Sequence, residues 1–263
     1  MHPFIDLGFV KIPMYGVMIA SAYLVSYLYL VKRGKDAGFD KSKISDIMFY
    51  IVLWGFIGAK ILYIFTFYND FGNNFYERFI NIFTLTNLRA GFVFYGGFIS
   101  ASIFVYYYSQ KNKINFFKLA DFFAPAIPLA HSIGRLGCFF AGCCHGRETN
   151  SFLGVVFTSP YCEVDVSLIG HKIHPTQLYE SIGNFMIFLF LNRLSKNKNL
   201  KEGSLIFGYF ISYSFLRFIV EFFRGDNRGG YWLGYFSQAQ LISILVIIFS
   251  FIFLRFYVWK NKK

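Results

Sequence analysis

Two arginines lie in stretches of the chain that are otherwise apolar enough for the interior of a membrane. Arg135 follows His131 by four residues, while Arg217 precedes Glu221 by four and Arg224 by seven, so each group would share a helix face. Because a charge in hydrocarbon needs a partner or water, these residues are candidates for a functional site. The arginines outnumber the nearby carboxylates, and a guanidinium suits the fork geometry of phosphate. The pattern therefore predicts a site for an anion, such as a phospholipid headgroup.

Buried charges also occur as purely structural ion pairs between helices, and that alternative stays open for some of these residues. Arg217 and Glu221 have the spacing of an ion pair within one helix, whatever else they do. Lys60 lies inside an apolar run, where a structural pairing competes with a functional role. Arg135 differs, because three small residues surround it that would let a backbone or a substrate approach closely: Ser132, Gly134 and Gly137.

The cysteines of the chain allow several interpretations. They are Cys138, Cys143, Cys144 and Cys162, too few for a disulfide scaffold. The first three could ligate a metal together with His145, one of the middle two could pair with Cys162, or all could be small apolar side chains. Their spacing is not a zinc pattern such as a repeated CxxC. We therefore predict no catalytic metal site and no cofactor.

Composition indicates the elements that must position these residues. The 263 residues are 56% hydrophobic and only 15% charged, whereas a soluble domain usually carries about a quarter charged residues. The apolar residues form repeated runs of roughly 18 or more, the length that crosses a bilayer. The sequence predicts an all-α integral membrane protein with seven transmembrane helices, at 14–31, 46–67, 90–109, 119–143, 175–194, 203–224 and 237–259.

Lysine and arginine alternate between the two sides of these predicted helices. They gather in the segments 32–43, 111–118, 196–201 and 260–263, which marks that side as cytoplasmic. Residue Arg228 is among the scattered charges of the other side. This places the N terminus outside and the C terminus in the cytoplasm. The net charge of +12 follows from this distribution, so we predict no nucleic-acid binding.

Two predicted outside segments are longer than simple connections. Residues 69–89 are polar and aromatic and could form an arm at the membrane interface. Residues 145–173 contain two short β-favouring runs, Phe152–Thr158 and Cys162–Leu168, which predict a small hairpin-like cap. Because no internal repeat or long linker is present, we expect residues 1–263 to form a single transmembrane domain.

The segments that hold these residues resemble the bacterial prolipoprotein diacylglyceryl transferases. Gly134-Arg135-Leu136-Gly137, with Phe139, Gly142, Gly146 and Arg147 after it, is similar to the family signature. Other segments agree in order over essentially the whole chain: Met14-Tyr15-Gly16, Phe94-Tyr95-Gly96-Gly97, His174-Pro175-Thr176-Gln177-Leu178-Tyr179-Glu180, Arg217-Phe218-Ile219-Val220-Glu221-Phe222-Phe223-Arg224, and Ser237 with Gln240.

The resemblance implies an activity, its partners and its site residues. Such enzymes move the diacylglyceryl group of phosphatidylglycerol to the lipobox cysteine thiol of a prolipoprotein, the first step of lipoprotein lipidation. The implied setting is the bacterial cytoplasmic (inner) membrane, with the active site near the outer leaflet, a monomer, and membrane lipids around it. The implied catalytic residues are Tyr95, Arg135, Arg217 and Glu221. The substrate-binding residues are Tyr15, His131, Gly134, Gly137, Cys138, Gly146, Gln177, Tyr179, Glu180 and Arg224.

Some positions depart from the family pattern. Cys138 stands where the family usually has Asn, and Cys143 where it usually has Glu. The acidic-Pro-Asp sequence after the last arginine is replaced by Gly225-Asp226-Asn227. The residue before Gly96-Gly97 is commonly a histidine, proposed as the base, and is Tyr95 here. A free thiol has a pKa of about 8.5, so the acceptor needs a base or a field that favours thiolate.

Several residues could supply that base. We predict that Tyr95 serves in the position of the histidine, although a phenol is a weak base unless a nearby arginine lowers its pKa. His131, His145 and Glu221 are alternatives. Two other functions stay open: a lipid or anion carrier that has lost catalysis, and a transferase with another acceptor or donor. A carrier more often has internal symmetry or broken paired helices, which we do not detect.

Overall fold

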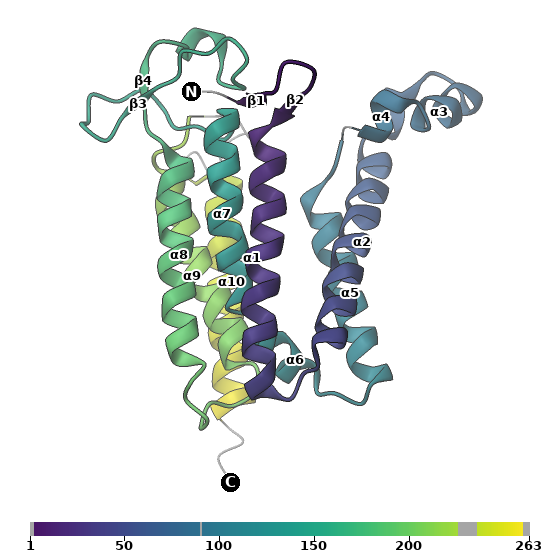
Figure 1. The fold of residues 1–263 in the computed structure, drawn as a ribbon, viewed down its shortest axis with the longest axis vertical. Helices are drawn as coiled ribbons and strands as arrows, with labels where there is room; N and C mark the ends of the chain where they lie inside the picture. The colour runs from purple at the N-terminus through teal and green to yellow at the C-terminus, as the bar shows by residue number, and fades with distance from the viewer. Residues whose placement is uncertain (1–2, 90, 226–235, 260–263) are drawn as a thin grey trace. The chain divides into compact units, whose positions relative to one another are not determined.

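The computed structural model describes residues 3–89, 91–225 and 236–259, and α-helices dominate it (Figure 1). Contacts divide the chain into two compact units, Met1–Leu30 with Ala120–Lys263, and Val31–Leu119. Several residues named from the sequence lie outside the described residues: Asp226, Asn227, Arg228, Lys260, Lys262 and Lys263.

The first unit is a group of helices in which α8 (Thr176–Leu194) packs against both α7 (Ala126–Ala141) and α9 (Ser204–Glu221). Helix α10 (Gln238–Phe253) packs against α9 and continues as a π-helical turn over Leu254–Trp259. Helix α1 (Met14–Ala37) begins in this unit (Figure 1), and α6 (Phe116–Phe123) precedes α7.

Polar side chains fix where two of these helices begin. The Asp121 carboxylate accepts hydrogen bonds from the backbone N–H groups of Gly203 (2.8 Å) and Ile206 (2.9 Å) at the start of α9. At the start of α10, Ser237 and Gln240 form a capping box. Both arrangements satisfy N–H groups that a helix leaves without an internal partner. Asp121 thus joins α6 to the beginning of α9.

Short antiparallel pairs lie at one end of the first unit (Figure 1). Strands β1 (Phe4–Asp6) and β2 (Lys11–Pro13) form an N-terminal hairpin that the sequence did not indicate. In the cap, strand β3 (Val155–Val156) lies in the first predicted run and pairs with β4 (Lys172–Ile173).

The prediction of a second strand at Cys162–Leu168 is wrong. That run buries Cys162 and Val164 against Phe157 and Ile173 in a small apolar core, and then forms the 3-10 turn η2 (Val166–Leu168). Asp165 Oδ1 accepts hydrogen bonds from the Ser167 backbone N–H (3.0 Å) and hydroxyl (2.8 Å), which favours a turn over a strand.

The second unit is built on two helices, α2 (Lys41–Thr66) and α5 (Phe94–Lys111), which pack against each other (Figure 1). The predicted arm between them consists of the 3-10 turn η1 (Tyr68–Phe71) and helices α3 (Phe75–Ile82) and α4 (Leu85–Arg89). The Asn74 side chain caps α3 by accepting from the Glu77 N–H (2.9 Å). Large apolar side chains of the arm are exposed: Phe75, Tyr76, Phe79, Ile80 and Phe83.

In the part of the chain that the structure describes, four helical stretches are long and apolar enough to cross a membrane: Met14–Lys35, Lys41–Thr66, Ser204–Glu221 and Gln238–Phe256. The remaining three predicted ranges are also largely helical, in α5, in α6 with α7, and in α8. The predicted span at 119–143 is divided between α6 and α7, and α8 buries the polar residues Gln177, Glu180 and Asn184. The protein is therefore helical with four candidate membrane spans, and the count of seven stays a prediction.

Candidate active site

A single buried carboxylate gathers three arginines in the first unit. Glu180, on α8, is fully buried. Its two oxygens lie 2.6 Å from Arg135 Nη2, 3.2 Å from Arg217 Nη1 and 3.2 Å from Arg224 Nη1. The arginines come from α7, from α9 and from the segment just after α9. Residues separated by more than 80 positions in the chain thus form one charged cluster.

A second carboxylate lies at the edge of this cluster. Glu221 Oε2 is 2.6 Å from Arg217 Nη2 and 4.0 Å from Arg224 Nε, and the Ser237 hydroxyl donates to its other oxygen at 2.8 Å. The predicted intrahelical pair of Arg217 with Glu221 is therefore confirmed. Among the residues that the structure describes, this largely buried cluster contains three arginines and two glutamates. A cluster rich in guanidinium groups favours the binding of an anion.

His131, on α7, and Tyr213, on α9, lie at the edge of this cluster. Arg135 Nε donates a hydrogen bond to His131 Nε2 at 3.2 Å, so that ring nitrogen is the acceptor and carries no proton. The ring of Tyr213 lies 5.0 Å from the ring of His131. Sequence reasoning did not single out Tyr213. Its position four residues before Arg217, on the same helix face, was the available signal.

The cysteines that follow α7 are held in a turn against the start of α8. Helix α7 ends at Ala141, and Gly142 takes the left-handed conformation with φ 84°. Gln177 Nε2 then donates to the Cys143 carbonyl (2.7 Å), and the Thr176 hydroxyl donates to the Cys144 carbonyl (2.8 Å). Gln177, predicted to shape a substrate site, therefore positions the cysteine turn.

Three of the four thiols come together. The Sγ atoms of Cys138, Cys143 and Cys144 all lie within 4.8 Å of one another, and each side chain is half-buried. The alternative of a disulfide to Cys162 is not realised, because none of the four cysteines, all of them described, is disulfide-bonded. Cys162 packs in the core of the cap instead.

Two of the predicted substrate-binding glycines lie where backbones meet. A Cβ atom at Gly146 would approach the carbonyl oxygens of His174 and Phe223 to 2.6 Å, and Gly146 forms a bridge with Arg224. A Cβ at Gly137 would lie 3.0 Å from the Met18 Cβ, where α7 approaches α1. Gly134, in contrast, has only an ordinary contact at 3.6 Å. Close packing explains why the first two positions are glycine.

The predicted tyrosines lie in three different settings. Tyr15 is in the first turn of α1, next to Gly137. The Tyr179 hydroxyl lies 3.0 Å from His174 Nδ1, at the beginning of α8. Tyr95 is on α5 of the second unit, where 54% of it is exposed.

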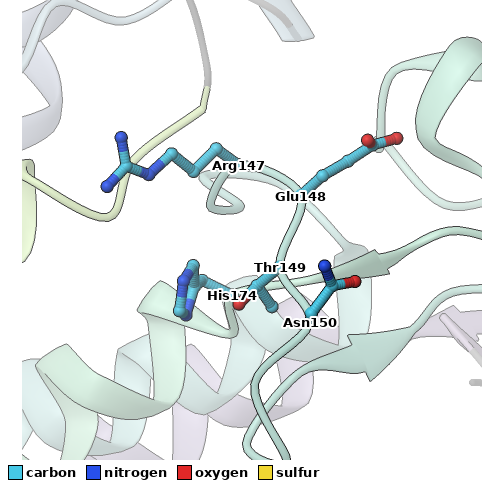
Figure 2. A pocket seen from close by; sticks show the side chains of 5 residues that line it. All are labelled: Arg147, Glu148, Thr149, Asn150 and His174. Atoms are coloured by element: carbon cyan, nitrogen blue, oxygen red, sulfur yellow. The ribbon is translucent and has the colours of Figure 1, made fainter.

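A polar pocket of about 420 Å³ opens in the cap, lined by Arg147, Glu148, Thr149, Asn150 and His174. In Figure 2, Arg147 and Glu148 extend in opposite directions from neighbouring positions of the chain. Burial and the Arg147 guanidinium hold the pKa of His174 below its usual range. The pocket contains none of the three clustered arginines, so it is distinct from the charged site.

Comparison with known proteins adds to this geometry. A family model described as prolipoprotein diacylglyceryl transferase matches residues 3–256. The chain belongs to this family. A phosphatidylglycerol–prolipoprotein diacylglyceryl transferase of Clostridium tetani is 38% identical over 244 residues, 92% of each chain. The protein named phosphatidylglycerol–prolipoprotein diacylglyceryl transferase 2 of Clostridium perfringens is 36% identical, over 90% of this chain and 88% of the relative.

A more distant transferase of the same name, from Listeria monocytogenes, is 33% identical over 94% of this chain and 86% of the relative. Family membership, these bacterial relatives and the four apolar helices make the chain a bacterial inner-membrane protein.

Proposed function

We propose that this protein transfers the diacylglyceryl group of phosphatidylglycerol to the lipobox cysteine of a prolipoprotein. The observation that carries the proposal is the cluster of three arginines around Glu180. Phosphatidylglycerol carries an anion that guanidinium groups bind well, its phosphodiester. The names of the relatives, and the large share of this chain that they match, support the same reaction.

The reaction joins a sulfur to a carbon and releases a phosphate ester. The acceptor thiolate attacks the glyceryl carbon of the diacylglyceryl group, so that a C–S bond forms and the C–O bond to phosphate breaks. The electron pair of the broken bond goes to glycerol phosphate, which gains negative charge. Arg135 and Arg217 would hold the phosphate and stabilise that charge, because preorganised cations in a dry site act most strongly where charge develops.

Glu180 has a positioning role in this proposal. Its carboxylate contacts Arg135 Nη2 and Arg217 Nη1, which fixes the orientation of both guanidinium groups. Glu221 would position Arg217 in the same way. The remaining predicted residue, Tyr95, stays a candidate base on the strength of the sequence alone.

The direct test is a transfer assay with purified protein. We expect phosphatidylglycerol and a lipobox peptide to give a peptide heavier by one diacylglyceryl group, detected by mass spectrometry, with release of glycerol phosphate. A peptide with Ser in place of the acceptor Cys is the matched control and should stay unmodified. Binding of phosphatidylglycerol without any modified peptide would favour the alternative of a lipid carrier.

We also propose seven membrane spans, with the charged site near the outer leaflet. The support is the distribution of lysine and arginine along the sequence. Alkaline phosphatase fused after residue 75 or 155 should be active, and inactive after residue 36, 112 or 198. The reverse pattern would place the site on the cytoplasmic side and contradict the topology.

A further inference from the structure

The three thiols that meet at the end of α7 are not used by the proposed role of the arginines. Cys138 lies in the last turn of α7, and the left-handed Gly142 reverses the chain so that Cys143 and Cys144 return to it. Cys144 also has a positive φ, 59°, which a residue with a side chain rarely adopts. The backbone is therefore held in an uncommon conformation where the thiols converge.

That conformation is fixed from another helix. Gln177 and Thr176 hold the carbonyls of Cys143 and Cys144 from the first turn of α8, three and four residues before Glu180. Cys138, on the other side, is one helical turn after Arg135. The thiols thus adjoin the proposed phosphate site through both α7 and α8.

The distances suit a metal ion of tetrahedral preference. A zinc ion binds thiolate sulfur at about 2.3 Å, so that two sulfurs on one ion are about 3.8 Å apart. The three Sγ atoms lie within 4.8 Å of one another, and small side-chain rotations would close that difference. The spacing in the sequence argued against a metal because no CxxC occurs, but the turn at Gly142 brings the thiols together without that motif.

The described residues offer three protein ligands for such a site. Among the residues that the structure describes, no histidine or carboxylate joins the three thiols as a possible ligand. His145 follows them directly in the sequence, but its Nδ1 lies 3.0 Å from the Gly146 carbonyl. Three protein ligands with an open fourth position are typical of catalytic zinc, whereas structural zinc has four.

We propose that Cys138, Cys143 and Cys144 bind Zn²⁺ and that the acceptor cysteine of the prolipoprotein occupies its fourth position as a thiolate. This inference rests on the proposed transferase function and names where the acceptor binds. Zn²⁺ held by the three thiolates would lower the pKa of the acceptor thiol, whose proton would pass to water. The acceptor sulfur would then form the C–S bond while the C–O bond to phosphate breaks, so the metal would supply the thiolate.

Metal content gives the first test, on the full chain purified with a phosphine reductant and without added thiols. We expect about one zinc per chain by elemental analysis, and at least tenfold less in Cys143→Ser and Cys144→Ser. Cys162→Ala is the matched control, because Cys162 lies in the core of the cap and outside the cluster; it should keep its zinc. Equal zinc in all four proteins, or none in the wild type after zinc is supplied, would overturn the site.

Replacing zinc by Co²⁺ in the wild-type protein tests the open coordination position by spectroscopy. This test needs neither a mutation nor catalytic activity. Three thiolates around Co²⁺ should give a sulfur-to-metal charge-transfer band in the near ultraviolet. Adding a lipobox peptide should strengthen this band and shift the visible bands, whereas the peptide with Ser in place of Cys should not. A spectrum that the Cys peptide leaves unchanged would overturn the acceptor site.

The transfer assay separates this inference from the proposed function. Removal of zinc by a chelator should lower transfer at least tenfold, and added zinc should restore it. Full activity of the zinc-free protein would overturn the inference and leave the transferase function intact. Absence of transfer under every condition would contradict the proposed function, while the cobalt spectra would still decide whether a thiol peptide binds the metal.

Discussion

The two units of this chain hold their helices together by different interactions. In the first unit, Glu180 joins α7, α8 and α9 by accepting contacts from three arginines in a buried place. In the second unit, α2 and α5 approach at glycines, where a Cβ at Gly58 would overlap the Gly96 carbonyl and a Cβ at Gly97 would lie 2.7 Å from the Gly55 carbonyl. One contact depends on charge and the other on shape.

The difference indicates which unit carries the chemistry. Removing charges from water costs free energy that mutual attraction repays only with good geometry, and apolar packing often stabilises as well or better. The α2–α5 contact demonstrates that this chain can pack helices by shape. The gathering of three arginines around Glu180 is therefore better explained by a ligand than by stability.

Lys60 extends the comparison, because it is a charged residue within the apolar helix α2 of the second unit. Its ammonium donates to the carbonyls of Asn87 and Gly91, and it lies over the rings of Tyr63 (5.0 Å) and Phe92 (5.2 Å). These contacts join α2 to α4 and to the chain between α4 and α5. Of the two interpretations open from the sequence, they favour the structural one.

The largest effect is expected for Arg135. Arg135→Gln should lower transfer by roughly 10²–10³-fold or more, because one charge-stabilising donor is typically worth that much. Arg135→Lys should recover little, since an ammonium lacks the planar fork. The measurement is the initial rate with phosphatidylglycerol and lipobox peptide, with thermal unfolding as the control for folding. Full activity in Arg135→Gln would remove the residue from the mechanism and break the comparison.

The glycine contact of the second unit gives the next effect, on stability. Gly58→Ala should destabilise the protein by about 1–3 kcal/mol, because the added methyl group meets the Gly96 carbonyl and Ser100. Gly55→Ala on the same helix is the matched control, since nothing lies within 4 Å of its Cβ position. Thermal unfolding in detergent compares the two. Equal unfolding temperatures would mean that α2 and α5 do not depend on this contact.

The sequence predicted the helical fold and most of the charged residues, because both depend on local patterns. Apolar runs predict helices, and the spacing of Arg217 and Glu221 predicts their ion pair. Glu180 was placed in the site only by resemblance. Its role as shared partner of three arginines depends on the packing of α7, α8 and α9, which no local pattern specifies.

The cysteine turn could not be predicted for a similar reason. Its geometry depends on the left-handed Gly142 and Cys144 and on hydrogen bonds from the distant Thr176 and Gln177. In the cap, the partner of β3 is Lys172–Ile173. The run nearer in sequence, Cys162–Leu168, does not pair with β3, because it contains a turn that the Asp165 side chain stabilises. In the cysteine turn and in the cap, side-chain hydrogen bonds to the backbone fix a geometry that residue spacing in the sequence does not predict.

Substitution of Lys60 should have a moderate effect on stability and little on transfer. Lys60→Met keeps the length and apolar stem of the side chain and removes the donor to the two carbonyls, which should cost about 1 kcal/mol. Activity per folded protein should stay within about twofold of wild type. We would measure both thermal unfolding and the initial rate. A loss of activity comparable to that of Arg135→Gln, with unfolding unchanged, would make Lys60 a functional residue instead.

The smallest effect is expected for Gly134, and it tests how tightly the charged unit is packed around Arg135. A methyl group at Gly134 meets only the Ile19 side chain, at 3.6 Å, whereas one at Gly137 would lie 3.0 Å from Met18 and 3.3 Å from Tyr15. Gly134→Ala should therefore leave the unfolding temperature unchanged, and Gly137→Ala should lower it, because α1 would have to move away from α7. If lipid approaches Arg135 over Gly134, the same Gly134→Ala substitution should raise the KM for phosphatidylglycerol a few-fold with kcat retained, since it takes space without removing a charge. A fall in stability for Gly134→Ala, equal to that of Gly137→Ala, would mean that packing, and not access for a substrate, requires both glycines.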